Sequence, residues 1–297
     1  MKMNDFNSLN FYFGKLLKNV FLTTLVFIAL FPIFWILSLS LRPNQETLGR
    51  NPTFLPKKWT FENYLNLFGI DVNTTRMQQL DFDALLNFII NGAIVAVIVT
   101  ILACFLSILA GYSFSRYSFP GKKILLITIL NTQMFPYMAI ILPIYVLYSK
   151  LDFINTYQGL VIAELGLVLP FSIWMMKGFC DTIDKELEDA AYIETNSKLF
   201  ILWKIILPII IPGVVAVSMF CFLASWNHLL YVMLLGTDES IMTVPYGLIT
   251  KYGGHTSRYT YGLLSAGIVI TTAPIVIIFL WFQKYFISGL TSGAVKG

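Results

Sequence analysis

The stretch ALLNFIINGAIVAVIVTILACFLSILAGYSF, residues 84–114, contains no acidic or basic side chain. A helix needs about 20 mostly apolar residues to cross the hydrocarbon core of a membrane, so this stretch is long enough to span it. Five other stretches are also long and mostly apolar, although three of them carry one or two charged side chains, at 19–41, 124–148, 157–179, 201–235 and 259–286. We therefore expect an all-α polytopic membrane protein with six transmembrane helices.

The composition of the whole chain agrees with this expectation. Of its 297 residues, 57% are hydrophobic and 12% are charged, against roughly 45–50% and about 25% in soluble domains. So few charges cannot cover a water-facing surface, which excludes a soluble enzyme, a disordered chain and a secreted disulfide scaffold. The net charge of +4 is too small to indicate a nucleic-acid partner. The three cysteines and two histidines lack the spacing of a metal site.

The distribution of Lys and Arg predicts the orientation, because short cytoplasmic loops are rich in both. Placing the amino terminus inside puts the basic loops after the second and fourth spans in the cytoplasm. We expect residues 1–18 to be a cytoplasmic tail and 19–41 the first span. An extracytoplasmic loop at 42–83 and a five-helix core at 84–286 follow, before a second cytoplasmic tail at 287–297.

Prolines and polar residues predict irregularities inside three spans. Pro32 predicts a local kink in the first span. A polar run, Asn131 to Gln133, interrupts the third span. Residues 201–235 exceed one membrane thickness, and we expect a break near Pro208 and Pro212.

An acidic segment lies between the fourth and fifth spans. Residues 181–198 hold six of the sixteen acidic side chains. Ile183, Leu187, Ala190 and Ala191 recur at helical spacing, so one face is apolar and small while the other is acidic. The residues alone leave two interpretations open, a helix that docks against a partner and a solvated connector.

This segment carries a resemblance. ELEDAAYIETNSKLFILWKIILP, residues 186–208, resembles the EAA loop of ABC-importer permeases, in which E-A-A is followed by three residues, Gly, nine residues and I-x-L-P. Thr195 stands where glycine is usual, which predicts a less sharp bend, because glycine is the residue that adopts positive φ freely. The positions that match are Asp189, Ala190, Ala191, Ile205, Leu207 and Pro208.

The resemblance extends over most of the chain. Residues 91–123, 134–160, 171–191, 225–235 and 243–248 also look like carbohydrate-type permeases, and the ending SGLTSGAVKG, 288–297, is similar to the MalG-like branch. The resemblance implies the type I ABC importer permease fold, in the bacterial cytoplasmic (inner) membrane, with both termini cytoplasmic.

The same resemblance implies partners and roles. It implies a heterodimer with a second related permease, two ATPase subunits that use ATP and Mg²⁺, and an extracytoplasmic solute-binding protein facing the first outer loop. The cargo would be an oligosaccharide, malto-oligosaccharide-like or another, including acidic ones. It assigns ATPase coupling to Glu188, Asp189, Ala190, Ala191, Glu194, Thr195, Ile205, Leu207 and Pro208, and an ATPase-contacting tail to Gly293, Lys296 and Gly297. No phosphate-loop motif G-x-x-x-x-G-K-[ST] occurs, so no ATP hydrolysis and no cofactor are expected in this chain itself.

Polar groups inside the spans are candidates for the substrate pathway. Glu164 is the one acid within them, and an ionisable residue in a membrane is costly and therefore a functional candidate. Its place near the outer face favours the alternative, an interfacial or intersubunit hydrogen bond. Amides beside aromatic rings suit sugars, as in the stretch that ends at His228. The full candidate set is Asn131, Gln133, Glu164, Ser225, Trp226 and Asn227.

Two other classes of function compete. An ion-coupled secondary sugar transporter would use intramembrane carboxylates and an internal repeat of broken helices. The chain has one such carboxylate and no obvious duplication. A membrane-embedded enzyme would need a catalytic constellation, and none is recognisable at the sequence level.

Overall fold

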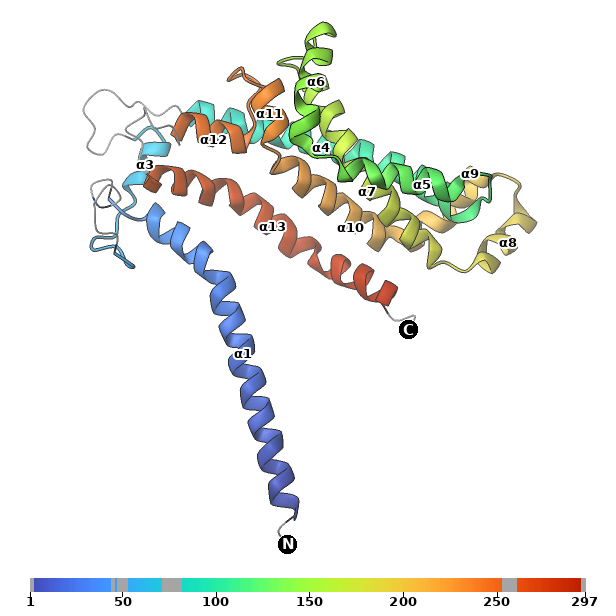
Figure 1. Cartoon of the computed structure of the whole chain (residues 1–297), viewed down its shortest axis with the longest axis horizontal. Coiled ribbons are helices and arrows are strands. Elements are labelled where there is room, and N and C mark those ends of the chain that lie inside the picture. The colour runs from blue at the N-terminus through green and yellow to red at the C-terminus, as the bar shows by residue number, and fades with distance from the viewer. Residues whose placement is uncertain (1–2, 44–45, 47–52, 71–81, 253–260, 295–297) are drawn as a thin grey trace. The chain divides into compact units, whose positions relative to one another are not determined.

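The computed structural model describes residues 3–43, 46, 53–70, 82–252 and 261–294, and all its regular elements there are helical (Figure 1). The chain divides into two compact units. One comprises residues 1–81 with 252–270, and the other comprises residues 82–251 with 271–297. Each unit is described by itself below.

The first unit contains α1 (Met3–Ser40), α3 (Glu62–Leu67) and the beginning of α13 (Tyr261–Ala294). Pro32 lies inside α1, and the helix continues on both sides of it. The stretch Gly14–Ser40 is long and apolar enough to cross a membrane, and none of its most apolar window is buried within the chain. In a membrane these side chains would contact lipid or another chain.

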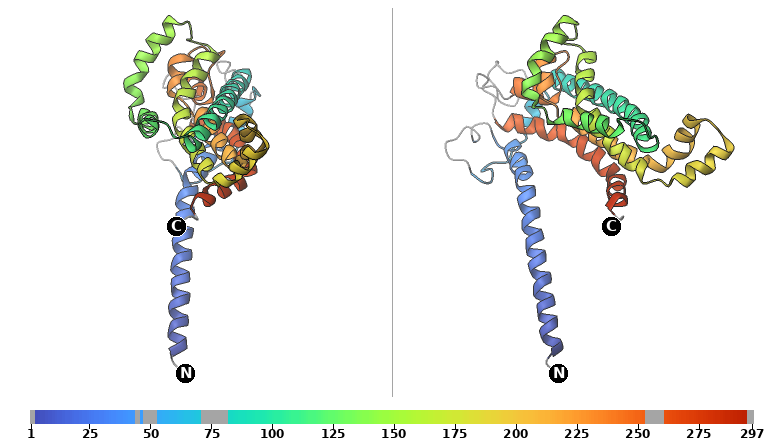
Figure 2. Two further views of the ribbon diagram at one scale, coloured as in Figure 1. Left: turned by 90° about the vertical axis from the view of Figure 1, so that its right-hand side faces the viewer. Right: turned by 45° about the vertical axis from the view of Figure 1, so that its right-hand side comes forward.

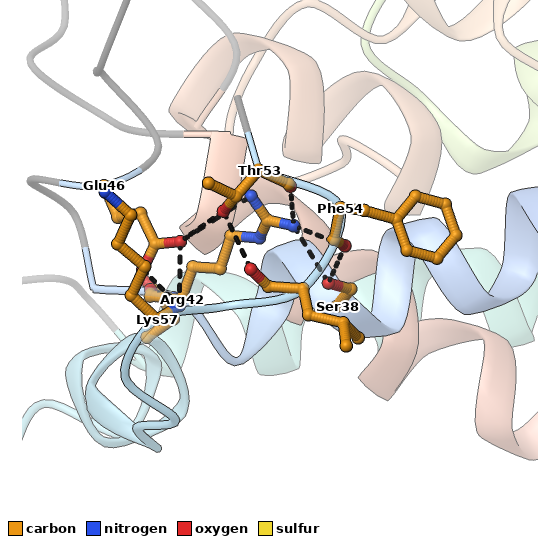
Figure 3. Close-up of polar contacts among 8 residues, drawn as sticks. Ser38, Arg42, Glu46, Thr53, Phe54 and Lys57 are labelled. Atoms are coloured by element: carbon orange, nitrogen blue, oxygen red, sulfur yellow. Dashed lines mark hydrogen bonds and ion pairs between the residues drawn. The ribbon is translucent and has the colours of Figure 1, made fainter. Parts of the chain in front are cut away.

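A buried arginine ties the segment after α1 back onto that helix (Figure 3). Arg42 is 1% exposed, and its Nη2 donates to the carbonyl oxygens of Thr53 at 2.6 Å and Phe54 at 2.9 Å. The same nitrogen lies 3.1 Å from Ser38 Oγ. Its guanidinium also lies over the Trp35 ring, 5.2 Å from the centroid. A charge this deeply buried requires such partners.

Glu46 completes this cluster. Its carboxylate lies 3.9 Å from Arg42 Nη1 and accepts hydrogen bonds from the Thr53 hydroxyl and the Lys57 backbone N–H. Desolvation acts to raise the pKa of Glu46, but these hydrogen bonds and the Arg42 charge together lower it below its usual value. Because its pKa is lowered, Glu46 stays ionised and keeps its ion pair with Arg42 over the physiological pH range.

The second unit is built around three long helices that lie side by side, α4 (Phe82–Arg116), α7 (Tyr157–Asp181) and α10 (Leu207–Trp226) (Figures 1 and 2). In a membrane, helices associate closely where small residues let their backbones approach. Gly111 of α4 is such a residue, because a Cβ there would lie 2.8 Å from the backbone nitrogen of Lys177. Gly213 of α10 likewise leaves room for the Phe179 ring.

The predicted third span is bent sharply. It consists of α5 (Lys122–Asn131), a short 3-10 turn η1 (Thr132–Met134) and α6 (Tyr137–Lys150). The two halves meet at 96°, so the structure has five continuous helices able to cross a membrane, or six if this pair counts as one span. The break falls at the polar run and Pro136, where the sequence predicts an interruption. The six-span, all-α prediction is confirmed in this form.

The fifth span is broken, but not where the prolines predicted. After α8 (Lys185–Glu194) and α9 (Lys198–Ile201), a π-turn η2 (Leu202–Ile206) leads directly into α10. Pro208 is the second residue of α10, where a missing N–H is tolerated best, and α10 continues through Pro212. The preceding π-turn takes up the remaining distortion. The prediction of a break at these prolines is therefore wrong; the helix ends at Trp226, and α11 (Leu230–Leu235) follows.

Polar contacts hold the segment between α11 and α12 (Val244–Tyr252) against the long helices. Asn91 of α4 donates through Nδ2 to the carbonyl oxygens of Ser240 and Met242, both at 3.0 Å. Its Oδ1 accepts from the Tyr157 hydroxyl at 2.6 Å. The Asn91 side chain of α4 is therefore bonded both to the start of α7 and to the segment that leads into α12.

The close approach of α4 and α7 yields a first prediction. Gly111→Ala should destabilise the detergent-solubilised protein by about 1–3 kcal/mol, the usual cost of overpacking, because the added Cβ meets backbone atoms that cannot move freely. Gly166→Ala on α7 is the matched control, since nothing lies within 4 Å of its Cβ position. Thermal unfolding of both variants tests this. Equal midpoints would contradict the close contact.

Candidate functional site

The α8 helix contains the acidic, alanine-bearing segment. Asp184 caps its start, and the Asp184 carboxylate accepts from the Glu186 backbone N–H at 3.2 Å. Acidic side chains in the first turn also favour the helix, because they face its positive end. At the other end Thr195 has φ −152° and ψ 138°, an extended conformation. The helix thus ends without a positive φ, and threonine fits in place of glycine.

The two faces of α8 differ in exposure. Glu188 and Ala191 are buried at 5% and 8% exposure. On the opposite side Leu187, Ala190 and Ile193 are exposed, Ile193 at 88%. Their spacing of three residues places them along one side of the helix, and we call them the apolar stripe of α8. An unpartnered apolar stripe on a short charged helix indicates a surface that another protein covers.

The inner face of α8 is fastened to the end of α4. Glu188 forms an ion pair with Arg116 Nε, and its second oxygen accepts from the Tyr112 hydroxyl at 3.0 Å. Arg116 also donates through Nη2 to the Ile183 carbonyl oxygen at 3.0 Å. The side chains of Arg116 and Glu188 are only 8% and 6% exposed. Because both charges are buried and bonded, α8 is anchored to α4 at this point.

The remaining predicted coupling residues fall into two groups. Asp189 and Glu194 are exposed on α8, beside the apolar stripe. Ile205 lies in the π-turn, and Leu207 and Pro208 begin α10. Of the predicted tail, Gly293 lies within α13, while Lys296 and Gly297 lie outside the described residues.

Three of the predicted pathway residues line one cavity. It has a volume of about 150 Å³ and opens between η1, α7 and the end of α10. Glu164 there is 1% exposed and accepts a hydrogen bond from the Ser225 hydroxyl. Gln133 donates through Nε2 to the Leu167 carbonyl oxygen at 2.6 Å. The cavity is lined by Gln133, Glu164, Leu167, Val168, Phe220, Ala224, Ser225 and His228.

The other predicted pathway residues lie elsewhere. Asn131 is exposed at the end of α5. Trp226 is buried and stacks on Phe222, with 5.7 Å between ring centroids. Asn227 is exposed and donates to the Leu223 carbonyl oxygen at 2.8 Å, which caps α10. These three residues therefore do not line the cavity.

Sequence reasoning missed the role of Arg116 and Tyr112. They precede Glu188 by more than 70 positions, and no local pattern connects them. The one hint in the sequence is that Arg116 and Tyr112 both lie near the predicted cytoplasmic end of the second span. An arginine at a helix end is ordinarily a solvated or lipid-headgroup contact, so the sequence alone gave it no partner.

The structure defines an all-helical membrane protein with broken apolar spans and an outlying amphipathic helix, and comparison with known proteins specifies its family. Residues 103–292 match the family described as binding-protein-dependent transport system inner membrane component. The chain is 30% identical to the inner membrane ABC transporter permease protein YcjP of Escherichia coli, covering 93% of this chain and 94% of that protein.

It is also 34% identical to the trehalose/maltose transport system permease protein MalG of Thermococcus litoralis, over 91% of this chain and 92% of that protein. Its fold is similar to a chain in the crystal structure of a bacterial ABC transporter involved in import of the acidic polysaccharide alginate. That match has a TM-score of 0.74 at 21% identity and covers 93% and 97% of the two chains.

The chain belongs to the family of binding-protein-dependent ABC transporter inner membrane permeases. It is a multi-pass inner membrane subunit and not itself an ATPase. Membership in this family implies ATPase and binding-protein partners. The resemblance and the fold class inferred from the sequence are confirmed.

The buried ion pair under α8 yields a second prediction. Arg116→Met should destabilise the protein by about 3–5 kcal/mol, because it leaves the Glu188 carboxylate buried without a cation. Lys177→Met is the matched control. It breaks the more exposed i,i+4 pair with Asp181, a contact worth about 1 kcal/mol or less.

Thermal unfolding in detergent provides the measurement. The double variant Arg116→Met with Glu188→Leu should recover part of the loss, since apolar side chains often replace a buried pair without penalty. Equal effects of Arg116→Met and Lys177→Met would show that α8 is not anchored in this way.

Proposed function

We propose that this chain forms half of the translocation pathway of an ATP-driven, binding-protein-dependent importer for an oligosaccharide. A second related permease would form the other half, and two ATPase subunits would bind ATP and Mg²⁺. Relatives support the substrate class. Besides the trehalose/maltose permease, the chain is 30% identical to the trehalose permease SugB of Mycobacterium tuberculosis and to the arabinooligosaccharides permease AraQ of Bacillus subtilis.

One observation carries the coupling part of the proposal, the exposed apolar stripe on a helix whose opposite face is locked to α4. A helix that only connects two spans has no reason to expose Leu187 and Ile193 to water. A helix that docks into a cleft of the ATPase covers them. The small side chain of Ala190, between them, allows close approach of the partner.

The attachment of α8 to α4 explains how closure of the ATPase subunits would move the spans. When ATP binding closes the ATPase subunits, each docked α8 moves with its ATPase. The Glu188–Arg116 pair and the Tyr112 hydrogen bond pull α4 along with α8. The cavity between the two permeases opens outward, and hydrolysis returns it inward. The loaded binding protein favours the outward state only by its differential affinity for that state.

We also propose that both termini are cytoplasmic and that the first outer loop, held by Arg42 and Glu46, faces the binding protein. The basic side chains near α8 and the α4–α5 connection support this orientation. The cargo would be a malto-oligosaccharide-like or another sugar, with acidic ones included in the range to be screened.

Reconstitution tests the energy source. In vesicles that contain the full importer and an external binding protein, sugar uptake should follow internal ATP and persist without ion gradients. Uptake that follows a proton or sodium gradient and ignores ATP would instead support an ion-coupled secondary transporter.

The apolar stripe yields a third prediction. Ala190→Arg should abolish co-purification of the ATPase subunits and ATP-driven uptake, because the long charged side chain blocks the docking face. Ala190→Ser is the matched control and should retain both, since it stays small. The thermal midpoint of the permease should change little in either variant, because Ala190 is exposed.

Ala191→Arg tests the other face of α8. This position is buried at 8% exposure, so the substitution should destabilise the permease itself. Retained assembly and uptake in Ala190→Arg would refute the assignment of the stripe as the docking surface.

A further inference from the structure

Two helix breaks meet at the cavity that contains Glu164. Gln133 comes from the break in the third span, and His228 comes from the break that follows α10. At membrane depth, non-helical backbone is tolerated where it is buried in protein or lines a water-filled cavity. Two breaks at one cavity therefore indicate a polar space built into the bundle.

Glu164 has an unused acceptor in this cavity. One carboxyl oxygen accepts from the Ser225 hydroxyl, whereas Oε1 is buried and has no hydrogen-bond partner in the structure. Among the described residues, no Lys, Arg or His forms an ion pair with this carboxyl group. Buried polar atoms are rarely left unpaired in native proteins. The orphaned oxygen therefore indicates a hydrogen-bonding ligand.

The lining of the cavity restricts the chemistry of that ligand. The lining includes the Gln133 amide, the Glu164 carboxyl, the Ser225 hydroxyl and the His228 imidazole as polar groups, and the Phe220 ring as an aromatic surface. A saccharide matches this combination, since its hydroxyls both donate and accept while its C–H faces pack on apolar surface. The volume of about 150 Å³ is several times the roughly 30 Å³ share of one water molecule. It suits one sugar unit and is too small for a whole oligosaccharide.

We propose that this cavity is a substrate subsite within this subunit, where one sugar unit of the cargo hydrogen-bonds to Glu164, Gln133 and Ser225. The inference rests on the proposed function and deepens it, because it assigns direct sugar contact to this permease. Glu164 lies two turns from the start of α7, and Ser225 lies in the last turn of α10. In the proposed orientation both ends are extracytoplasmic, so the subsite is reached from the side where the binding protein releases sugar.

The structural alternative is that Glu164 and Ser225 only join α7 to α10. The chain offers a matched control for this alternative. Ser172 Oγ lies 3.1 Å from Cys221 Sγ, a buried polar contact between the same two helices that does not line the cavity. Ser172→Ala removes a helix-to-helix contact and leaves the cavity lining intact.

The test uses the complete importer in proteoliposomes with its binding protein. Maltotriose, trehalose and arabinotriose serve as probes, and the sugar that the wild type takes up with ATP is carried forward. Glu164→Leu should raise the KM for uptake at least tenfold while the importer still assembles. Glu164→Gln should stay within about threefold of wild type, because it keeps the shape and a hydrogen-bonding group. Ser172→Ala should leave KM unchanged.

A second variant does not depend on removing a polar group. Ala224→Phe should fill the cavity and block uptake while the importer still assembles. The subsite proposal is overturned if Glu164→Leu behaves like Ser172→Ala, if Ala224→Phe transports normally, or if assembly is lost in step with uptake. If the wild type takes up none of the probes with ATP, the proposed function fails instead, which separates the two outcomes.

Discussion

In a bilayer, backbone N–H and C=O groups must find partners inside the protein, because lipid tails offer none. This constraint explains where the structure is regular and where it is not. The α4 and α7 helices run unbroken and satisfy their own backbone. The third and fifth spans break, and each break places a polar side chain, Gln133 or His228, at one cavity. These two breaks thus lie where polar side chains line a cavity.

A second constraint acts at the other end of the bundle, where charge must be buried to make a rigid joint. The Glu188–Arg116 pair contributes little net stability, since desolvation offsets much of the attraction. Its value lies in geometry, because three bonded groups fix the direction of α8 relative to α4. A looser, solvated connection would let α8 move without moving the spans. The apolar stripe on one face and the buried pair on the other thus fit one role in coupling.

The sequence predicts the parts of the fold that depend on local composition. Apolar length gives the bounds of α4 and α7 to within about two residues, and a polar run beside Pro136 gives the break in the third span. It fails at Pro208 and Pro212, because α10 begins beside Pro208, directly after a π-turn, and continues through Pro212. The prediction that Trp226 and Asn227 line the substrate pathway is not matched by the cavity, for a related reason. Composition identifies polar and aromatic groups, but only the rotation of α10 about its axis decides which of them face Glu164.

The two ends of the bundle are mechanically connected through the contact of α4 with α7. Gly111 lies about one turn before Arg116, and its missing Cβ brings the α4 backbone against Met176 and Lys177 of α7. In the proposed mechanism, a displacement of α8 would be passed to α4 by the buried ion pair and then to α7 by this close contact. The first half of α7 carries Glu164, which lines the cavity and has one carboxyl oxygen without a hydrogen-bond partner. A rigid pair of helices therefore links the proposed docking surface to the proposed sugar subsite without requiring any separate relay.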